Sequence, residues 1–148
     1  MRTRDSRAFR RGLRRFTRLI NNQLKHGCTE VTLAQCHVLL EIEDAGTPTM
    51  GQLATSLRLD NSTLSRTVDG LVSKQLVHRM IDDADRRGVM VELTDRGAST
   101  CAAIHADNDA SCRRVFEEIP TSEHRRIMQA FEVLVEAYDA CEDERESH

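Results

Sequence analysis

Hydroxyl and guanidinium side chains are concentrated in one short stretch of the sequence, "NSTLSRTVDG" at residues 61–70. Short hydroxyls and an arginine can hydrogen-bond to base edges in the major groove of DNA, and both also bind phosphate oxygens. Groove reading requires such side chains on one face of a helix, near its N-terminus. We therefore expect a reading face made of Ser62, Thr63, Ser65, Arg66 and Thr67.

A second polar stretch, "DADRRG" at 83–88, separates two strand-like segments at 77–82 and 89–93. Arginine is the residue favoured in the narrow, electronegative minor groove of A·T-rich DNA. We expect Arg86 and Arg87 to meet DNA, with Arg87 inserted and Asp85 orienting its guanidinium by a charge-assisted hydrogen bond. A charged turn between two strands is also the ordinary composition of a hairpin tip. This assignment therefore depends on the elements around it.

Thiols and imidazoles form a third group with possible chemistry. Cys28, Cys36 and His37 lie at or just before a predicted helix, and Cys101 and His105 share one face of a later helix. Thiolate with imidazole suits zinc or copper, and thiolates alone suit arsenite-like or electrophilic signals. Two alternatives stand beside a sensor. Cysteine often packs as a small hydrophobe, and a pocket for a small organic effector is at least as well supported, because no CxxC or HxxxH pair occurs.

The elements that must position these groups follow from hydrophobic periodicity. Helices are predicted at 8–25, 32–45, 50–58, 61–77, 94–119 and 121–144. Gly27 and Gly46 suit the helix ends. Expected N-caps are Thr49, then Asn61 or Ser62, then Thr94, then Thr121 or Ser122.

Helix, turn, helix and hairpin in that order predict a winged helix-turn-helix. The fold class expected is mainly α with a small β-hairpin wing, flanked by N- and C-terminal dimerisation helices. The winged DNA-binding domain is expected at 33–97, and the dimerisation helices at 1–32 and 98–148.

The segment also resembles the MarR family of bacterial and archaeal transcription regulators. Its "LA" brace helix, "ST.SR.V..L" recognition helix and "D.R" wing followed by "V.LT..G" all occur within residues 49–97. The resemblance places the family's minor-groove arginine on Arg87, its supporting acid on Asp85, and the groove-reading face on the residues from Ser62 to Thr67 named above. Arg58 departs from the pattern, because such proteins often have Gly in the turn between the two helices.

The ends of the chain carry opposite charge, although the net charge is only −3. Residues 1–25 hold nine Arg or Lys against one Asp, and residues 117–148 hold ten acids against three Arg. Apolar stripes run along both ends, at 9, 13, 16, 20 and 24 and at 127, 131, 134 and 138. MarR-like proteins are dimers whose terminal helices interlock, so the resemblance implies a homodimer. A monomeric bundle is the alternative, and the N-terminal arginines could instead contact phosphate.

These observations predict a homodimeric repressor that binds double-stranded DNA at an inverted repeat and responds to a small-molecule, metal or thiol-reactive signal. No cofactor is required. The alternative function is a winged-helix module that binds protein. No nucleotide loop, nucleophile elbow or HExxH motif supports an enzyme. No apolar run approaches the roughly 20 residues of a membrane span, and five cysteines without a paired pattern suit a cytoplasmic protein.

Overall fold

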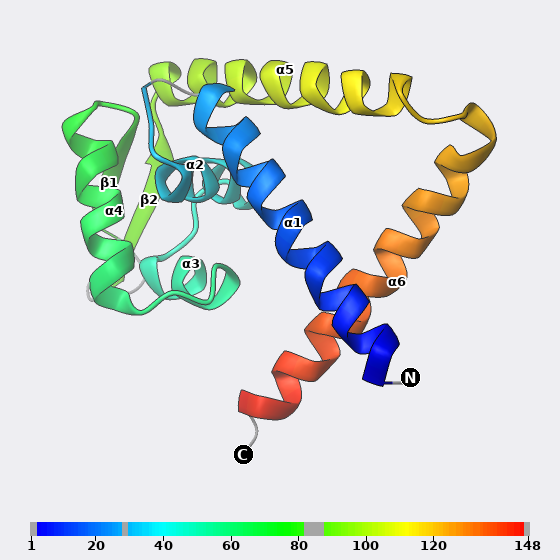
Figure 1. Ribbon diagram of the computed structural model, residues 1–148. Coiled ribbons are helices and arrows are strands. Elements are labelled where there is room, and N and C mark those ends of the chain that lie inside the picture. Colours follow the sequence, from blue (N-terminus) through cyan, green and yellow to red (C-terminus); the bar gives the residue numbers. More distant parts are fainter. Residues whose placement is uncertain (1–2, 28–29, 82–87, 147–148) are drawn as a thin grey trace. The chain divides into compact units, whose positions relative to one another are not determined.

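The structure is a computed structural model that describes residues 3–27, 30–81 and 88–146. The elements within these residues are, in chain order, α1 (Thr3–Gly27), α2 (Leu33–Ala45), α3 (Met50–Ser56), α4 (Asn61–Ser73), β1 (Val77–Ile81), β2 (Val89–Leu93), α5 (Asp95–Glu117) and α6 (Thr121–Glu146). The expected class, mainly α with one β-hairpin, is confirmed (Figure 1).

The chain divides into two compact units, residues 1–108 and 109–148, with the boundary inside α5. The first unit contains the only large core that the described residues form. α2, α3, α4 and the hairpin pack around it, and its members are fourteen buried apolar residues. They are Val31, Cys36, Val38, Leu39, Ile42, Leu53, Leu64, Val68, Leu71, Leu76, Val77, Val91, Cys101 and Ile104.

The sheet is a single antiparallel hairpin, with Val77 opposite Leu93 and Ile81 opposite Val89. The segment before α3 extends it, because the Val91 amide donates to the Pro48 carbonyl at 3.0 Å and Thr49 bridges to Met90. The wing is thus tied to the start of the brace helix by backbone hydrogen bonds.

Local side chains set most helix ends as expected. Thr49 caps α3 in a capping box with Gln52, and Gly46 ends α2 with φ of 80°. Thr94 caps α5, because its hydroxyl oxygen accepts a hydrogen bond from the Gly97 amide at 3.0 Å.

Two expected caps were wrong. Asp60, and not Asn61 or Ser62, caps α4, because its carboxylate accepts from the Thr63 amide at 2.9 Å. A carboxylate has two oxygens with about four acceptor positions, so it can also accept from both neighbouring hydroxyls, whereas a serine hydroxyl has a single oxygen. α6 begins at Thr121 directly after Pro120, whose carbonyl accepts from the Glu123 amide at 2.8 Å, so Thr121 and Ser122 lie inside the first turn.

The fourth helix is also shorter than predicted. It ends at Ser73, because Gln75 has φ of 60° and the Leu76 amide turns back to the Leu71 carbonyl at 3.0 Å. This turn buries Leu76 completely. Helical periodicity alone could not show that Leu76 belongs to the turn, since it continues the apolar stripe of α4.

Polar contacts hold the end of α4 against the starts of α2 and α5. Lys74 Nζ donates to the Glu30 carbonyl at 2.5 Å and to Gln35 Oε1 at 2.8 Å. Arg96 Nη1 donates to the Lys74 carbonyl at 2.8 Å, and its guanidinium also pairs with Glu30. Gln35 is the buried polar residue of this region, and its Oε1 also accepts from the Thr32 amide at 3.1 Å.

Candidate nucleic-acid interface

The turn between α3 and α4 determines where the recognition helix starts. Arg58 adopts the left-handed conformation with φ of 50°, the region that favours glycine. The Leu59 amide then closes the turn onto the Ala54 carbonyl at 3.0 Å. Arg58 therefore adopts the left-handed backbone conformation that a glycine would adopt in this turn. The departure from the family pattern leaves that backbone conformation the same.

One face of α4 is completely buried, and this orients the rest. Leu64, Val68 and Leu71 have no exposed surface. Ser62 and Arg66 are exposed, and Thr63, Ser65 and Thr67 are half-buried. The expected reading face therefore lies outward at the N-terminal half of α4, where a helix can enter the major groove. Figure 1 shows α4 beside the hairpin, at one side of the winged unit.

Asp60 gathers the hydroxyls at the start of this face. Ser62 Oγ donates to Asp60 Oδ1 at 2.5 Å, and Thr63 Oγ1 donates to Asp60 Oδ2 at 2.7 Å. The hydrogen bonds from Ser62 and then Thr63 hold the pKa of the Asp60 carboxyl well below its usual range. Both hydroxyls keep lone pairs that can accept from bases, but they must leave Asp60 before they can donate to DNA.

Further along α4, two polar side chains donate hydrogen bonds to carbonyl groups of the helix backbone. Arg66 Nε donates to the Ser62 carbonyl at 3.2 Å, and Thr67 Oγ1 donates to the Thr63 carbonyl at 2.9 Å. These bonds fold the side chains along the exposed surface of α4.

The wing tip with Asp85, Arg86 and Arg87 lies outside the described residues, so the minor-groove assignment remains a prediction. The described part of the hairpin adds a residue that the sequence reasoning missed. Arg79 of β1 pairs with Asp69 of α4 at 2.7 Å between Nη1 and Oδ1. The sequence does carry a signal for this residue, because side chains alternate between the two faces of a strand. Arg79 is a charged residue on the strand face that Val77 and Val91 otherwise place in the core.

The candidate sensor residues occupy different environments. Cys36 and Cys101 are buried in the core, and Cys101 Sγ lies 3.8 Å from the Leu39 carbonyl as a weak donor. His37 is exposed. His105 is also exposed, with Nε2 at 2.6 Å from Glu43 Oε2.

Cys28 lies outside the described residues. Within the part of the chain that the structure describes, no group of three or more His, Cys, Asp or Glu side chains is placed to hold a metal ion.

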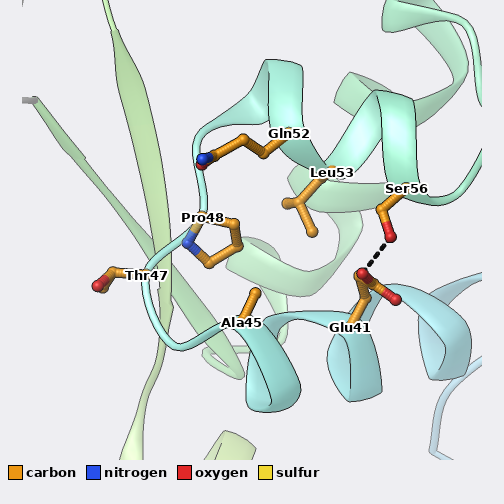
Figure 2. A pocket seen from close by; sticks show the side chains of 7 residues that line it. All are labelled: Glu41, Ala45, Thr47, Pro48, Gln52, Leu53 and Ser56. Carbon is orange, nitrogen blue, oxygen red and sulfur yellow. Dashed lines mark hydrogen bonds between the residues drawn. The ribbon is translucent and has the colours of Figure 1, made fainter.

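A hollow of about 260 Å³ lies elsewhere, between α2 and α3 (Figure 2). Ser56 Oγ donates to Glu41 Oε1 across one side of it. Its lining residues are Glu41, Ala45, Thr47, Pro48, Gln52, Leu53 and Ser56. None of the candidate sensor residues that the structure describes lines this hollow.

A brace helix, a tight turn, a recognition helix with an outward polar face and a hairpin on the same core define a winged helix-turn-helix. Residues 31–89 match the model of the MarR family. This match covers the winged helix-turn-helix segment, and the relatives below support the resemblance to the MarR family.

The chain is similar to the multiple antibiotic resistance protein MarR of Salmonella typhimurium, with 38% identity over 88 residues, or 60% of each chain. It is 32% identical over 75 residues to the HTH-type transcriptional repressor NicR of Pseudomonas putida, covering 51% of this chain and 48% of that one. The chain thus spans about 60% of the length of the MarR relatives that it matches.

Solved structures are similar over more of the chain. The apo form of wild-type MarR from Escherichia coli gives a TM-score of 0.73 at 28% identity, covering 87% of this chain and 94% of that one. A mutant of the same protein complexed with operator DNA gives 0.68 at 28% identity, covering 87% and 91%. Among the described residues, no helix is long and apolar enough to cross a membrane.

Proposed function

We propose that this chain is a sequence-specific regulator of transcription that binds double-stranded DNA, with α4 in the major groove and the wing in the adjacent minor groove. The observation that carries the proposal is the orientation of α4. Burial of Leu64, Val68 and Leu71 leaves the hydroxyls and Arg66 outward near the helix N-terminus. The similar E. coli protein solved with operator DNA supports this function.

The regulator acts as a homodimer on an inverted repeat. α1 exposes Phe9, Phe16 and Ile20, between 36% and 49% of each side chain, and α6 exposes Phe131 and Tyr138 to a similar degree. Apolar stripes of this size on two helices are ordinarily covered by a partner. A symmetric dimer presents two recognition helices to two half-sites about one helical turn, or roughly 34 Å, apart.

Repression is the simplest outcome of such binding, and the similar NicR is named a repressor. An effector that binds the DNA-competent arrangement less well than another arrangement would release the operator. The signal is a small molecule, a metal or a thiol-reactive compound. Because Cys36 and Cys101 are buried, a small-molecule effector is favoured over a thiol reagent acting on these two residues.

The test is fluorescence-anisotropy titration of DNA from the chain's own upstream region, alongside a random duplex of equal length. Arg66→Ala should weaken specific binding by about 1–3 kcal/mol if Arg66 reads a base. Arg87→Ala should also weaken binding, as the sequence predicts. Arg125→Ala, an exposed arginine of α6, is the matched charge control and should stay close to wild type.

Equal binding of wild type to operator and random duplex, in every effector condition, would contradict the proposal. That result would favour the alternative function, a winged helix that binds protein. Partner binding that survives both Arg66→Ala and Arg87→Ala would support this alternative further.

A further inference from the structure

The guanidinium of Arg79 connects the wing directly to the recognition helix. Nη1 lies 2.7 Å from Asp69 Oδ1, and Nη2 donates to both the carbonyl and the hydroxyl oxygen of Ser65 at 3.4 Å. Ser65 and Asp69 are four residues apart, so they lie on the same side of α4. One side chain of β1 thus reaches two successive turns of α4.

The position of Arg79 on its strand explains why it reaches the helix. Arg79 is opposite Val91, and both lie on the hairpin face that Val77 places in the core. The aliphatic part of an arginine can cover apolar surface while its charged end extends to a polar partner. The Arg79 side chain is 35% exposed and the Asp69 side chain is 57% exposed, so solvent screens this ion pair and its value lies in its geometry.

Binding by both α4 and the wing requires a fixed geometry between them. Two linked contacts strengthen each other only if both can be made at once, and a misplaced element loses that gain. Among the described residues, the backbone hydrogen bonds of the two strands reach the segment before α3 and not α4 itself. Arg79 supplies a direct polar connection at the level of the reading face.

We infer that Arg79 is a positioning residue for DNA recognition, which fixes the rotation of α4 relative to the wing through Asp69 and Ser65. Ser65 in this arrangement is the acceptor of Arg79, in place of the base-reading role expected from the sequence. The inference rests on the proposed DNA-binding function. The opposing hypothesis is that Arg79 contacts phosphate directly, as exposed arginines near DNA often do.

Asp69 separates the two hypotheses. Removing an acid near a DNA-binding surface ordinarily strengthens binding, because it removes repulsion from phosphate. A positioning role for Arg79 predicts the opposite effect, which is weaker DNA binding when Asp69 is replaced. Asp69→Asn should weaken specific binding about tenfold, Arg79→Met should do the same, and the double variant should be no weaker than either, as expected for two residues in one contact. Glu92→Gln is the matched control, because Glu92 is an acid of the same hairpin that pairs with His78 at 3.0 Å.

Salt dependence gives a second, independent readout. We would measure the operator affinity of the full chain by anisotropy over a series of KCl concentrations. A lost phosphate contact lowers the slope of log affinity against log salt by about 0.9. Positioning predicts that Arg79→Met lowers operator affinity with this slope unchanged and with random-duplex affinity unchanged. A merely structural role would lower the melting temperature but leave the operator-to-random ratio of the folded protein intact.

Each result supports or overturns the inference. Tighter or unchanged operator binding by Asp69→Asn overturns it, as does a smaller salt slope in Arg79→Met. Arg79→Lys replaces Arg79→Met if the latter melts below the assay temperature, and it should also weaken specific binding, because lysine lacks the fork that reaches both partners. If wild type binds its operator and Arg66→Ala weakens that binding, the proposed function stands whatever the Arg79 variants show.

Discussion

Asp60 shows how one side chain controls both the stability and the chemistry of the recognition helix. Its carboxylate caps α4 and accepts hydrogen bonds from Ser62 and Thr63. The same hydroxyls are candidates for reading bases. In the free protein they are hydrogen-bonded to an acid that lies where the helix would meet DNA. Binding must exchange these bonds for contacts with the nucleic acid.

The cap makes the stability of the protein sensitive to acid. Because the folded pKa of Asp60 lies below its unfolded value, the charged form stabilises the fold above the unfolded pKa, and this contribution is lost as pH falls through the folded pKa. Asp60→Asn should cap α4 without this charge dependence. The melting temperature of wild type relative to Asp60→Asn should therefore be highest near neutral pH and decline below about pH 4.

Thermal melts followed by circular dichroism at 222 nm from pH 3 to 7 would measure this difference. Asp60→Ala, which cannot cap, should melt below both proteins at pH 7. A wild-type advantage over Asp60→Asn that is independent of pH would contradict the role given to the carboxylate.

At the scale of elements, the start of α5 is fitted closely to the turn that ends α4. Thr94 Oγ1 donates to the Gln75 carbonyl at 2.7 Å, and the Thr94 amide donates to the Leu76 carbonyl at 3.1 Å. Gly97 is buried against that turn, and a Cβ there would lie 2.0 Å from the Leu76 carbonyl oxygen. Only a residue without a side chain permits this approach.

Gly97→Ala should therefore destabilise the protein by about 1–3 kcal/mol, because the backbone of the turn or of α5 must shift. Gly51→Ala is the control within α3, where the nearest atom to a new Cβ is Thr49 Oγ1 at an ordinary 3.9 Å. It should be neutral or stabilise by up to about 1 kcal/mol. Urea unfolding at constant pH measures both, and equal midpoints for Gly97→Ala and wild type would disprove the close fit.

At the scale of the whole molecule, the long helices carry apolar surface that the described residues leave uncovered. On α6, Met128, Phe131, Val135 and Tyr138 repeat at three and four residues and are 44–58% exposed. This is the spacing of a helix–helix seam. The acidic residues of the C-terminal part and the arginines of α1 add complementary charge to such an association.

If the seam forms the dimer, Phe131→Glu should give a monomer of 16.8 kDa, because a charge would be buried at its centre. Light scattering after gel filtration measures the mass. Val133→Glu is the matched control: Val133 is 65% exposed but lies on the opposite side of α6, so this variant should remain at twice the monomer mass. A wild type that is monomeric at micromolar concentration would contradict the dimer.

Local patterns in the sequence were sufficient to predict the elements and their order. Helical and strand periods differ, so Leu64, Val68 and Leu71 identified the buried face of α4, and the outward face with Arg66 followed from it. Caps such as Thr49 and Thr94 were predictable because each acts within three residues of its own position. The family resemblance rested on the same local segment, 49–97, and residues 31–89 match the model of that family.

What the tertiary structure decided involves groups far apart in the chain or choices between equivalent neighbours. Asp60 was preferred over Asn61 and Ser62 because the turn through Arg58 sets which residue precedes the first helical amide. The pairing of Arg79 with Asp69 depends on how β1 packs against α4, and the burial of Cys36 and Cys101 in one core depends on how α2 and α5 pack. Periodicity records which face of an element is apolar. It does not record which partner that face meets, because that partner is chosen by packing across the whole fold.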